Sequence, residues 1–384
     1  MKKVCIVIGS RANYGSIRSV MHEIHNDSSL ALQLILNNSS LLEKYGEVSK
    51  LIEADGFRIN YKIFNLLEGE TPMTMAKSTG LALMELPSIF QTLNPDIIMT
   101  VGDRFETIST AVAASYMNIP LAHTMGGEVT GTIDESIRHA ITKLSHIHFP
   151  ASKDAALRLE KLGEKKSHIF NVGCPRIDLV KNILEKDEKL SNNEINKYGV
   201  GDKLNFNEPF IILSQHPVTT EFMLAEKQMT ISLDVISKFK SQFLVLWPNA
   251  DAGSAAVSKA IRKFRENNEN KKIRFFKNLP SSLYINLLNK CSCIIGNSSS
   301  GIREGNFIGT PCVNIGTRQD GREKGENVLS VKHDFDQIIK ALRVQINAGK
   351  FKRGKLYGDG KAAKKITKVI KRLKKIDIQK KITY

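Results

Sequence analysis

Short apolar runs recur along the chain, and longer stretches with helical periodicity separate nearly all of them. Within the runs, apolar residues follow one another instead of alternating with polar ones, which is typical of strands buried on both faces of a parallel sheet. Parallel strands need helical crossovers, so the alternation predicts an α/β fold with doubly wound sheets. The runs expected to form strands are Val4–Gly9, Leu32–Leu36, Asp96–Val101, Pro120–His123, His146–Phe149, Ile169–Val172, Phe210–Ser214, Phe243–Trp247, Ile273–Phe276, Cys293–Gly296 and Cys312–Ile315.

A polar stretch divides the chain, whose 384 residues exceed the length of a typical single domain. This stretch, KDEKLSNNEINKYGVGDKLNFN, precedes a second series of strands that begins at Phe210. We therefore expect two doubly wound domains, residues 1–175 and 176–358, with the joint near 173–189. Ligands of such sheets bind beyond the carboxyl ends of the strands, so two facing domains would place their sites along a shared cleft.

Most of the net charge of +17 lies at the carboxyl end of the chain. Residues 350–384 contain 14 Lys/Arg and two Asp, and the other 349 residues carry only +5. Ile366, Val369, Ile370 and Leu373 recur at helical spacing, so we expect residues 359–384 to form a basic amphipathic helix that packs back on the body. The alternative is contact with an anionic membrane surface or with nucleic acid. Residues 358–383 have no aromatic side chain for base stacking, which argues against RNA.

The remaining composition predicts a cytoplasmic protein without a metal or other cofactor. The opening run MKKVCIVIGS is too short for the apolar core of a signal peptide, and no stretch reaches the ~18 apolar residues of a membrane span. The cysteines are odd in number and lie mostly in apolar runs, and Cys291-x-Cys293 lacks zinc-site spacing, so we expect buried thiols.

Residues 126–143 read GGEVTGTIDESIRHAITK, a glycine-rich loop that leads from a strand into a helix. Glu128, Asp134 and Glu135 lie around the expected helix start, and Arg138 and His139 follow one turn later. Carboxylates in this position, above the end of a strand, suit proton transfer on a bound ligand. The alternative is that Asp134 and Glu135 only cap the helix and favour its dipole.

Two further loops of the first half carry charged residues at strand ends. The segment GSRANYG places Arg11 at a helix start, which suits a phosphate, and it lacks the G-x-G-x-x-G pattern of NAD sites. In the segment VGDR, we expect Asp103 at the tip of a strand. Arg104 beside it would keep Asp103 ionised or contact a phosphate.

In the second half, two loops predict anion binding. The segment GNSSSGIRE brings Ser298 and Ser299 to a helix start as an anion cradle, and Glu304 one turn later suits a sugar hydroxyl. It is not a P-loop, because no G-K-[ST] is present. His216, in SQHPVTTE, suits a phosphate or ribose contact, and Arg318 adds a cation after the next strand.

Taken in order, these segments resemble the hydrolysing UDP-N-acetylglucosamine 2-epimerase family, which includes bacterial sialic-acid-pathway enzymes. The matching pieces are SRANY, VGDRFE, GGEVTGTIDESIRHAITK, QHPVTTE, PNADAGS, GNSSSGIRE and GTRQDGREKGENVL. The resemblance implies a GT-B-like architecture of two Rossmann-like domains, no metal, and a homodimer or homotetramer. It implies acid/base roles for Asp103 and Asp134, with Glu128 nearby, and substrate or nucleotide contacts at Arg11, Arg104, Met125, Arg138, His139, His216, Gly253, Ser298, Ser299, Glu304 and Arg318.

One position departs from the family pattern. Relatives carry a carboxylate in H-x-E-G-G-E, and here that position is Met125. A methionine side chain offers no hydrogen-bond partner to a sugar hydroxyl, and burying a hydroxyl without a partner costs about 1–3 kcal/mol. Met125 therefore favours a 6-deoxy sugar with a 4-acetamido group. The resemblance then implies UDP-N,N'-diacetylbacillosamine as substrate and UDP as a product. Alternatives are UDP-N-acetylglucosamine, a non-hydrolysing epimerase, and a GT-B glycosyltransferase.

Overall fold

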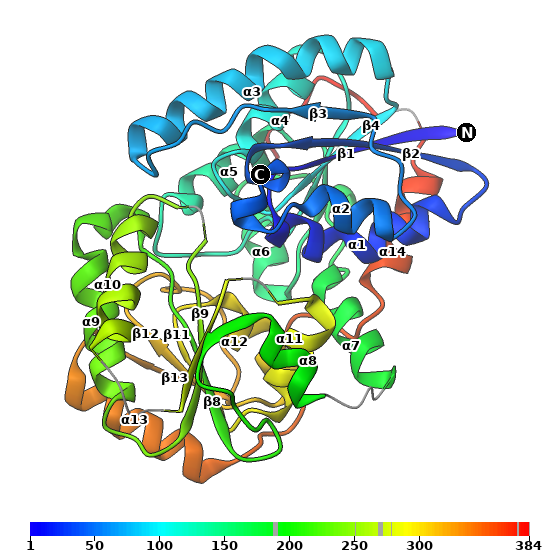
Figure 1. Ribbon diagram of the computed structural model, residues 1–384. Helices are drawn as coiled ribbons and strands as arrows, with labels where there is room; N and C mark the ends of the chain where they lie inside the picture. The colour runs from blue at the N-terminus through cyan, green and yellow to red at the C-terminus, as the bar shows by residue number, and fades with distance from the viewer. Residues whose placement is uncertain (187–190, 250, 268–271, 278, 375, 384) are drawn as a thin grey trace. The chain divides into compact units, whose positions relative to one another are not determined.

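The computed structural model forms two compact α/β units (Figure 1). The first unit contains Met1–Val129, Ile133–Leu179 and Tyr357–Tyr384, and the second contains Thr130–Thr132 and Val180–Leu356. The boundary therefore falls within the helix Pro175–Lys186, and the carboxyl end of the chain belongs to the first unit. The residues that the structure describes are 1–186, 191–249, 251–267, 272–277, 279–374 and 376–383.

The first unit is built on a six-stranded parallel sheet with the order β3-β2-β1-β4-β5-β6. Its central strands are buried along most of their length because successive residues are apolar, as expected for a sheet covered on both faces. The strands are β1 (Lys2–Ile8), β2 (Leu30–Asn37), β3 (Tyr61–Ile63), β4 (Ile97–Val101), β5 (Leu121–Thr124) and β6 (Ile147–Phe149).

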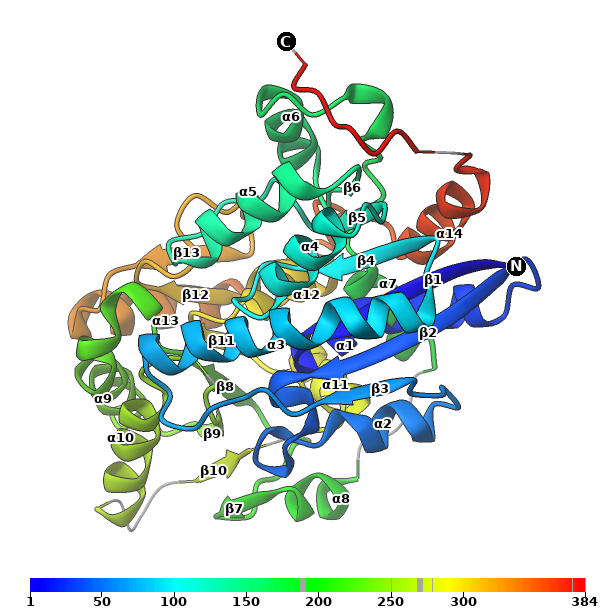
Figure 2. The same ribbon diagram turned by 90° about the horizontal axis from the view of Figure 1, so that it is seen from above.

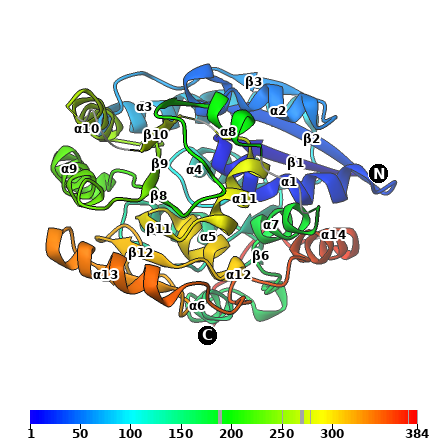
Figure 3. The ribbon, with the colours of Figure 1, turned by 60° about the horizontal axis from the view of Figure 1, so that its bottom comes forward.

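Local sequence signals define the helices of the first unit. Ser10 caps α1 by accepting a hydrogen bond from the Asn13 amide, and Thr71 forms a capping box before Pro72 at the start of α3. The last helix, α14, packs against α1 (Figure 3). The helices are α1 (Arg11–His25), α2 (Val48–Ala54), α3 (Pro72–Leu93), α4 (Thr107–Tyr116), α5 (Asp134–Leu144), α6 (Lys153–Lys161), α7 (Pro175–Lys186) and α14 (Ala362–Arg372), with short turns η1 (Asn38–Leu41), η2 (Glu43–Tyr45) and η3 (Lys166–His168).

The second unit has a seven-stranded sheet with the order β13-β12-β11-β8-β9-β10-β7, in which only the edge strand β7 is antiparallel. The strands are β7 (Gly199–Gly201), β8 (Phe210–Ser214), β9 (Gln242–Leu246), β10 (Ile273–Phe276), β11 (Cys293–Gly296), β12 (Cys312–Ile315) and β13 (Val328–Val331). Its helices are α8 (Asn192–Lys197), η4 (Thr219–Leu224), α9 (Ala225–Ile236), α10 (Ser254–Glu266), α11 (Ser281–Lys290), α12 (Ser299–Ile308) and α13 (Phe335–Ala348).

The fold confirms the predicted α/β class with two doubly wound sheets. One predicted strand is wrong: in Ile169–Val172 only Ile169 forms a bridge, to His148, because the chain turns at Gly173, with φ of 88°, and enters α7. Three strands were not predicted. β3, β7 and β13 are short edge strands with exposed positions, and so they lack a continuous apolar run.

Candidate active site

Each sheet has the strand order around which doubly wound proteins bind ligands. In the first sheet β1 lies between β2 and β4, and in the second sheet β8 lies between β9 and β11. The direction of winding reverses there, and ligands bind beyond the carboxyl ends of the strands. Residues 9–15 and 102–104 follow β1 and β4, and residues 215–221 and 297–304 follow β8 and β11. Each unit therefore brings predicted site residues to its own switch point.

Arg138 is the centre of the polar cluster in the first unit. Its side chain is 0% exposed, and its Nε donates to Asp103 Oδ2 at 2.8 Å. Its Nη1 donates to Glu135 Oε2 at 2.7 Å and to the backbone oxygen of Glu128 at 2.9 Å. Although burial opposes it, the negative charges of Asp103, Glu128 and Glu135 raise the pKa of Arg138. One buried cation thus gathers carboxylate residues from two loops and a helix.

Neither Asp134 nor Glu135 occupies the N-cap position of α5. Ile133 is the N-cap residue and makes no side-chain cap bond, and Asp134 is the first helical residue. Glu135 reaches along the helix instead, where its Oε1 lies 2.9 Å from His139 Nε2. Neither residue is the N-cap, and both lie in the first turn, where the helix dipole favours negative charge.

Arg138, which lies far from Asp103 in the chain, forms an ion pair with it that adjacency in the sequence did not suggest. Arg104 Nε donates to Glu106 Oε1 at 2.8 Å, and its guanidinium lies over the Phe105 ring. Arg138 is 35 residues away in the chain, and the packing of α5 against α4 and β5 brings it to Asp103.

His123 and Met125 lie beneath this cluster at the end of β5. The pKa of His123 falls to about 3 because its side chain is 0% exposed, so the ring is neutral and its Nε2 donates to the Gly102 carbonyl at 3.0 Å. Met125 is buried with φ of 61°, a left-handed conformation that few non-glycine residues adopt. Its Sδ lies 3.6 Å from Cys174 Sγ, and its methyl group packs against Gly102. This side chain is therefore an apolar neighbour of the Asp103 loop.

A second arginine lies beside Arg11 at the start of α1. Burial and the nearby charge of Arg176 lower the pKa of Arg11. Gly15 makes room for this arrangement, because a Cβ there would lie 2.3 Å from Arg176 Nη1. Two guanidinium groups near a helix N-terminus favour an anion. Arg176 was not predicted from the sequence, because it lies in the first turn of α7, far from Arg11 in the chain.

In the second unit, Asn297 joins the loops that follow β8, β11 and β12. It is 0% exposed, its Oδ1 accepts from the His216 amide at 2.7 Å, and its Nδ2 donates to the His216 carbonyl at 2.8 Å. Arg318 Nη1 and Gln319 Nε2 donate to the Asn297 carbonyl at 3.2 and 3.0 Å. His216 Nδ1 accepts from the Asn249 amide at 3.2 Å, which leaves Nε2 as its second polar atom. Asn297 was also missed, although it directly follows the strand within a quoted segment.

Two helix N-termini lie beside Asn297 and the loops that it joins. Ser298 is the N-cap of α12, Ser299 begins the helix, and Glu304 is buried within it. Gly253 precedes α10 with φ of 92° and packs against Pro217, the residue after His216. The positive ends of these two helix dipoles, together with Arg318, favour a phosphate group.

Metal ligation and membrane crossing would each require a distinct structural feature. Among the described residues, no group of three or more His, Cys, Asp or Glu side chains could hold a metal ion. In the same part of the chain, no helix combines the length and apolar character that crossing a bilayer requires.

The sequence matches a known protein family along most of its length. Residues 22–371 match the family model described as UDP-N-acetylglucosamine 2-epimerase. The UDP-N,N'-diacetylbacillosamine 2-epimerase (hydrolyzing) of Legionella pneumophila is 33% identical over 371 residues, which cover 97% of this chain and 96% of that protein. The GDP/UDP-N,N'-diacetylbacillosamine 2-epimerase (hydrolyzing) of Campylobacter jejuni is 35% identical over 89% of this chain and 87% of that protein.

The fold also matches a solved structure. The crystal structure of UDP-GlcNAc 2-epimerase from Neisseria meningitidis bound to UDP-GlcNAc has a TM-score of 0.81 and 18% identity, and the match covers 97% of this chain and all of that chain. This likeness supports the GT-B-like fold expected from the resemblance.

Proposed function

Because this chain is an enzyme of the UDP-N-acetylglucosamine 2-epimerase family, we propose that it hydrolyses a UDP-linked 2-acetamido sugar with inversion at C2. The products are UDP and the free manno-configured sugar. The observation that carries this proposal is the cluster at the switch point of the first sheet, where Arg138 gathers Asp103, Glu128 and Glu135 at the start of α5. A reaction that removes and returns a proton at one carbon needs more than one acid/base group, and this cluster offers several.

The reaction divides into two steps. A base removes the proton from C2 while the C1–O bond to UDP breaks, and the electron pair forms the C1=C2 bond of a 2-acetamidoglycal. An acid then returns a proton to C2 from the opposite face, and the oxygen of water bonds to C1 while a carboxylate base accepts the proton that the water loses. We assign the acid/base roles to Asp103 and Asp134, with Glu128 supporting them. Arg138 orients Asp103, and His139, through Glu135, belongs to the same network.

The nucleotide is assigned to residues that favour anions and hydroxyl groups. In the second unit, His216, Gly253, Ser298, Ser299 and Arg318 surround two helix N-termini, and Glu304 suits the ribose hydroxyls. Their fixed amides and cations stabilise the charge that develops on the leaving diphosphate. In the first unit, Arg11 and Arg104 are assigned to the substrate.

We propose UDP-N,N'-diacetylbacillosamine as the preferred substrate, which yields 2,4-diacetamido-2,4,6-trideoxymannose for legionaminic acid synthesis. The Legionella pneumophila relative is named for that substrate, and the Campylobacter jejuni relative is named for the GDP- or UDP-linked form of the same sugar. Met125 supports it physically, because its buried thioether beside Gly102 and Cys174 offers no partner to a hydroxyl group and suits a deoxygenated ring. The proposal includes a cytoplasmic homodimer or homotetramer, which light scattering on the purified protein would test.

The substrate proposal is tested by measuring UDP release from the two nucleotide sugars. We expect kcat/KM for UDP-N,N'-diacetylbacillosamine to exceed that for UDP-N-acetylglucosamine by about tenfold or more. Met125→Glu should narrow this ratio, whereas Met125→Leu, which stays apolar, should preserve it. Equal or reversed preference in the wild-type enzyme would contradict the substrate assignment. UDP release only when a sugar acceptor is added would instead indicate a glycosyltransferase.

A further inference from the structure

The segment that follows α14 crosses the first unit without regular secondary structure. Residues 376–383, termed the C-terminal strap here, form the red trace beside β6 and α6 in Figure 2. No residue of the strap belongs to the candidate site described above. Some of the strap's polar contacts reach the carboxyl end of α5, the helix that begins with Asp134 and carries Arg138.

Lys380 anchors the strap at the carboxyl end of α5. Its ammonium group lies 2.9 Å from the carbonyl oxygens of both Thr142 and Lys143, and 2.6 Å from that of Ser145. The last carbonyls of a helix have no partner within the helix, so a cation there satisfies them and also stabilises the helix dipole. Lys380 thus caps the carboxyl end of α5.

The same ammonium group balances a buried carboxylate. Glu164 is 1% exposed, and its Oε2 lies 2.5 Å from Lys380 Nζ and 2.9 Å from His148 Nε2. Lys143 Nζ lies 2.8 Å from Glu164 Oε1. Although burial opposes it, bonds from His148, Lys143 and Lys380 lower the pKa of Glu164 to about 2. Removing one partner of such a buried group leaves its charge poorly compensated.

Two further anchors connect the strap to the sheet and to the loop after α6. His146 Nε2 donates to the Ile378 carbonyl at 3.1 Å, and its Nδ1 accepts from the amide of Leu121, the first residue of β5. The Thr383 amide donates to the Gly163 carbonyl at 3.0 Å. The contact with Gly163 is close, because a Cβ there would lie 2.5 Å from Ile382.

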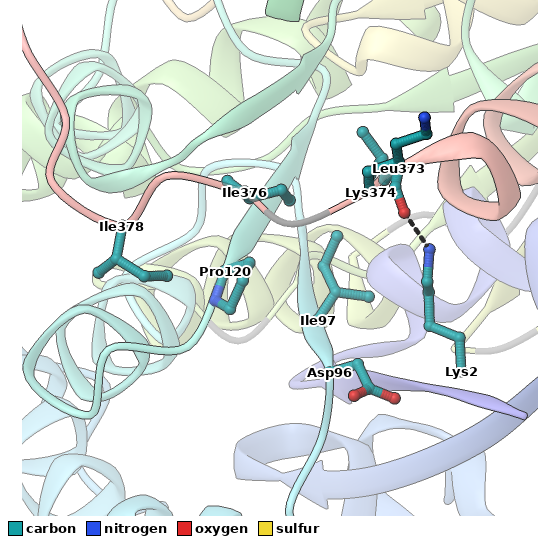
Figure 4. Close-up of a pocket in the computed structure, with 8 residues that line it drawn as sticks. All are labelled: Lys2, Asp96, Ile97, Pro120, Leu373, Lys374, Ile376 and Ile378. Carbon is teal, nitrogen blue, oxygen red and sulfur yellow. Dashed lines mark hydrogen bonds between the residues drawn. The ribbon is translucent and has the colours of Figure 1, made fainter.

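Residues on both sides of the end of α14 and of the strap line a hollow. Figure 4 shows this pocket of about 570 Å³, with Asp96 and Pro120 on one side and Ile376 and Ile378 on the other. At its edge, Lys2 Nζ donates to the Leu373 carbonyl at 2.6 Å. Because the strap borders a hollow instead of packing continuously on the sheet, its position depends on the few polar anchors, and Lys380 makes the largest number of these contacts.

We propose that Lys380 is a positioning residue for the reaction: by fixing the carboxyl end of α5 it sets the place of the carboxylates at the other end. This inference rests on the proposed function. Lys380 does not touch the reacting atoms, since the eleven residues of α5 span about 16 Å. A helix is stiff over this length, so a displacement of its anchored end moves Asp134 and Arg138 together.

The test compares Lys380→Met with Lys381→Met, a control with the same chemical change at an exposed neighbour, whose ammonium makes no bond within the described part of the chain. For Lys380→Met we expect kcat with UDP-N,N'-diacetylbacillosamine to fall about tenfold or more, and KM and the Kd of UDP to stay within about twofold. Amide hydrogen exchange across residues 134–145 should become faster. Lys380→Arg, which keeps a donor cation, should recover most of kcat.

Two results would overturn the proposal. The first is that amide hydrogen exchange in α5 is unchanged in Lys380→Met. The second is that Lys380→Met has a lower thermal stability but keeps the wild-type kcat at 25 °C, which would show that the strap has only a structural role. The exchange measurement does not require turnover. If the wild-type enzyme released no UDP but exchange in α5 rose in Lys380→Met alone, the proposed function would fail while the strap would still position α5.

Discussion

Arg138 donates to Asp103, to Glu135 and to the backbone of Glu128 from a fully buried position. Burial of a guanidinium group is costly unless carboxylates compensate its charge, so the cation and its partners depend on one another for their positions. Asp134 begins the same helix one turn earlier. These ion pairs therefore fix the orientation of the helix that carries the Asp134 carboxylate. A group that transfers a proton to or from a reacting atom requires such a fixed position.

Asp134→Asn should lower kcat by roughly a hundredfold or more, because an amide cannot transfer the proton. The Kd of UDP, measured by calorimetry, should stay unchanged. Asp154→Asn is the matched control, since Asp154 lies in the first turn of α6 and is also at a helix start. If both variants keep wild-type kcat and lose only a few tenths of a kcal/mol of stability, Asp134 serves the helix dipole alone.

At the scale of secondary structure elements, glycines show where loops are tightly constrained. Gly131 lies in the second unit, where its amide donates to the Arg318 carbonyl at 3.3 Å, and a Cβ on it would lie 2.0 Å from the Thr317 carbonyl oxygen. Gly80, in α3, has nothing within 4 Å of the corresponding position. The loop that carries Arg318 therefore requires glycine at 131, whereas α3 does not require it at 80.

Gly131→Ala should displace the Arg318 loop and weaken UDP binding, by about tenfold if one charge-assisted contact is lost. Gly80→Ala should leave UDP binding unchanged and stabilise the protein by about 0.5–1 kcal/mol, because alanine favours the helix. Calorimetric titration and thermal unfolding of both variants measure these effects. Unchanged UDP affinity in Gly131→Ala would show that the Arg318 loop does not bind the nucleotide.

The elements were more predictable from the sequence than the contacts between them. Buried parallel strands leave continuous apolar runs, so β8 and β10 were located to the residue, whereas the exposed edge strand β7 leaves no such signal. The loops of the site were found by their glycines and charges. The pairing of Asp103 with Arg138 was not predicted, because packing brings together two residues that are 35 positions apart in the chain. Adjacency in the sequence favoured Arg104 as the partner. Asn297 and Arg176 were missed for the same reason.

At the scale of the whole molecule, buried neutral histidines couple folding to pH. Burial lowers the pKa of His123 to about 3 and also lowers those of His146 and His148 from their ordinary value of 6.5. Below pH 6.5 the unfolded chain binds these protons and the folded chain does not, so stability is fully present above pH 6.5 and declines below it. Glu164, whose pKa in the folded protein is about 2, lowers the stability only when the pH falls below 4.5, the ordinary pKa of a glutamate side chain.

The free energy of unfolding should therefore fall between pH 6.5 and 4.5, by up to roughly 1 kcal/mol per pH unit for each buried histidine. Urea unfolding at pH 7.5, 6.0 and 5.0 measures this slope. His123→Gln, where it folds, should reduce the slope in this window and leave the loss below pH 4.5 in place. A stability that is constant from pH 7.5 to 5.0 would contradict the burial of these rings as neutral groups.

The central claim is that the enzyme removes a proton from C2, releases UDP and returns a proton to the opposite face. The most direct test is proton NMR of the purified enzyme with UDP-N,N'-diacetylbacillosamine in deuterated water. We expect free UDP and free manno-configured sugar in which C2 carries deuterium. Intact nucleotide sugar, or free sugar that keeps its C2 proton and its original configuration, would contradict the account.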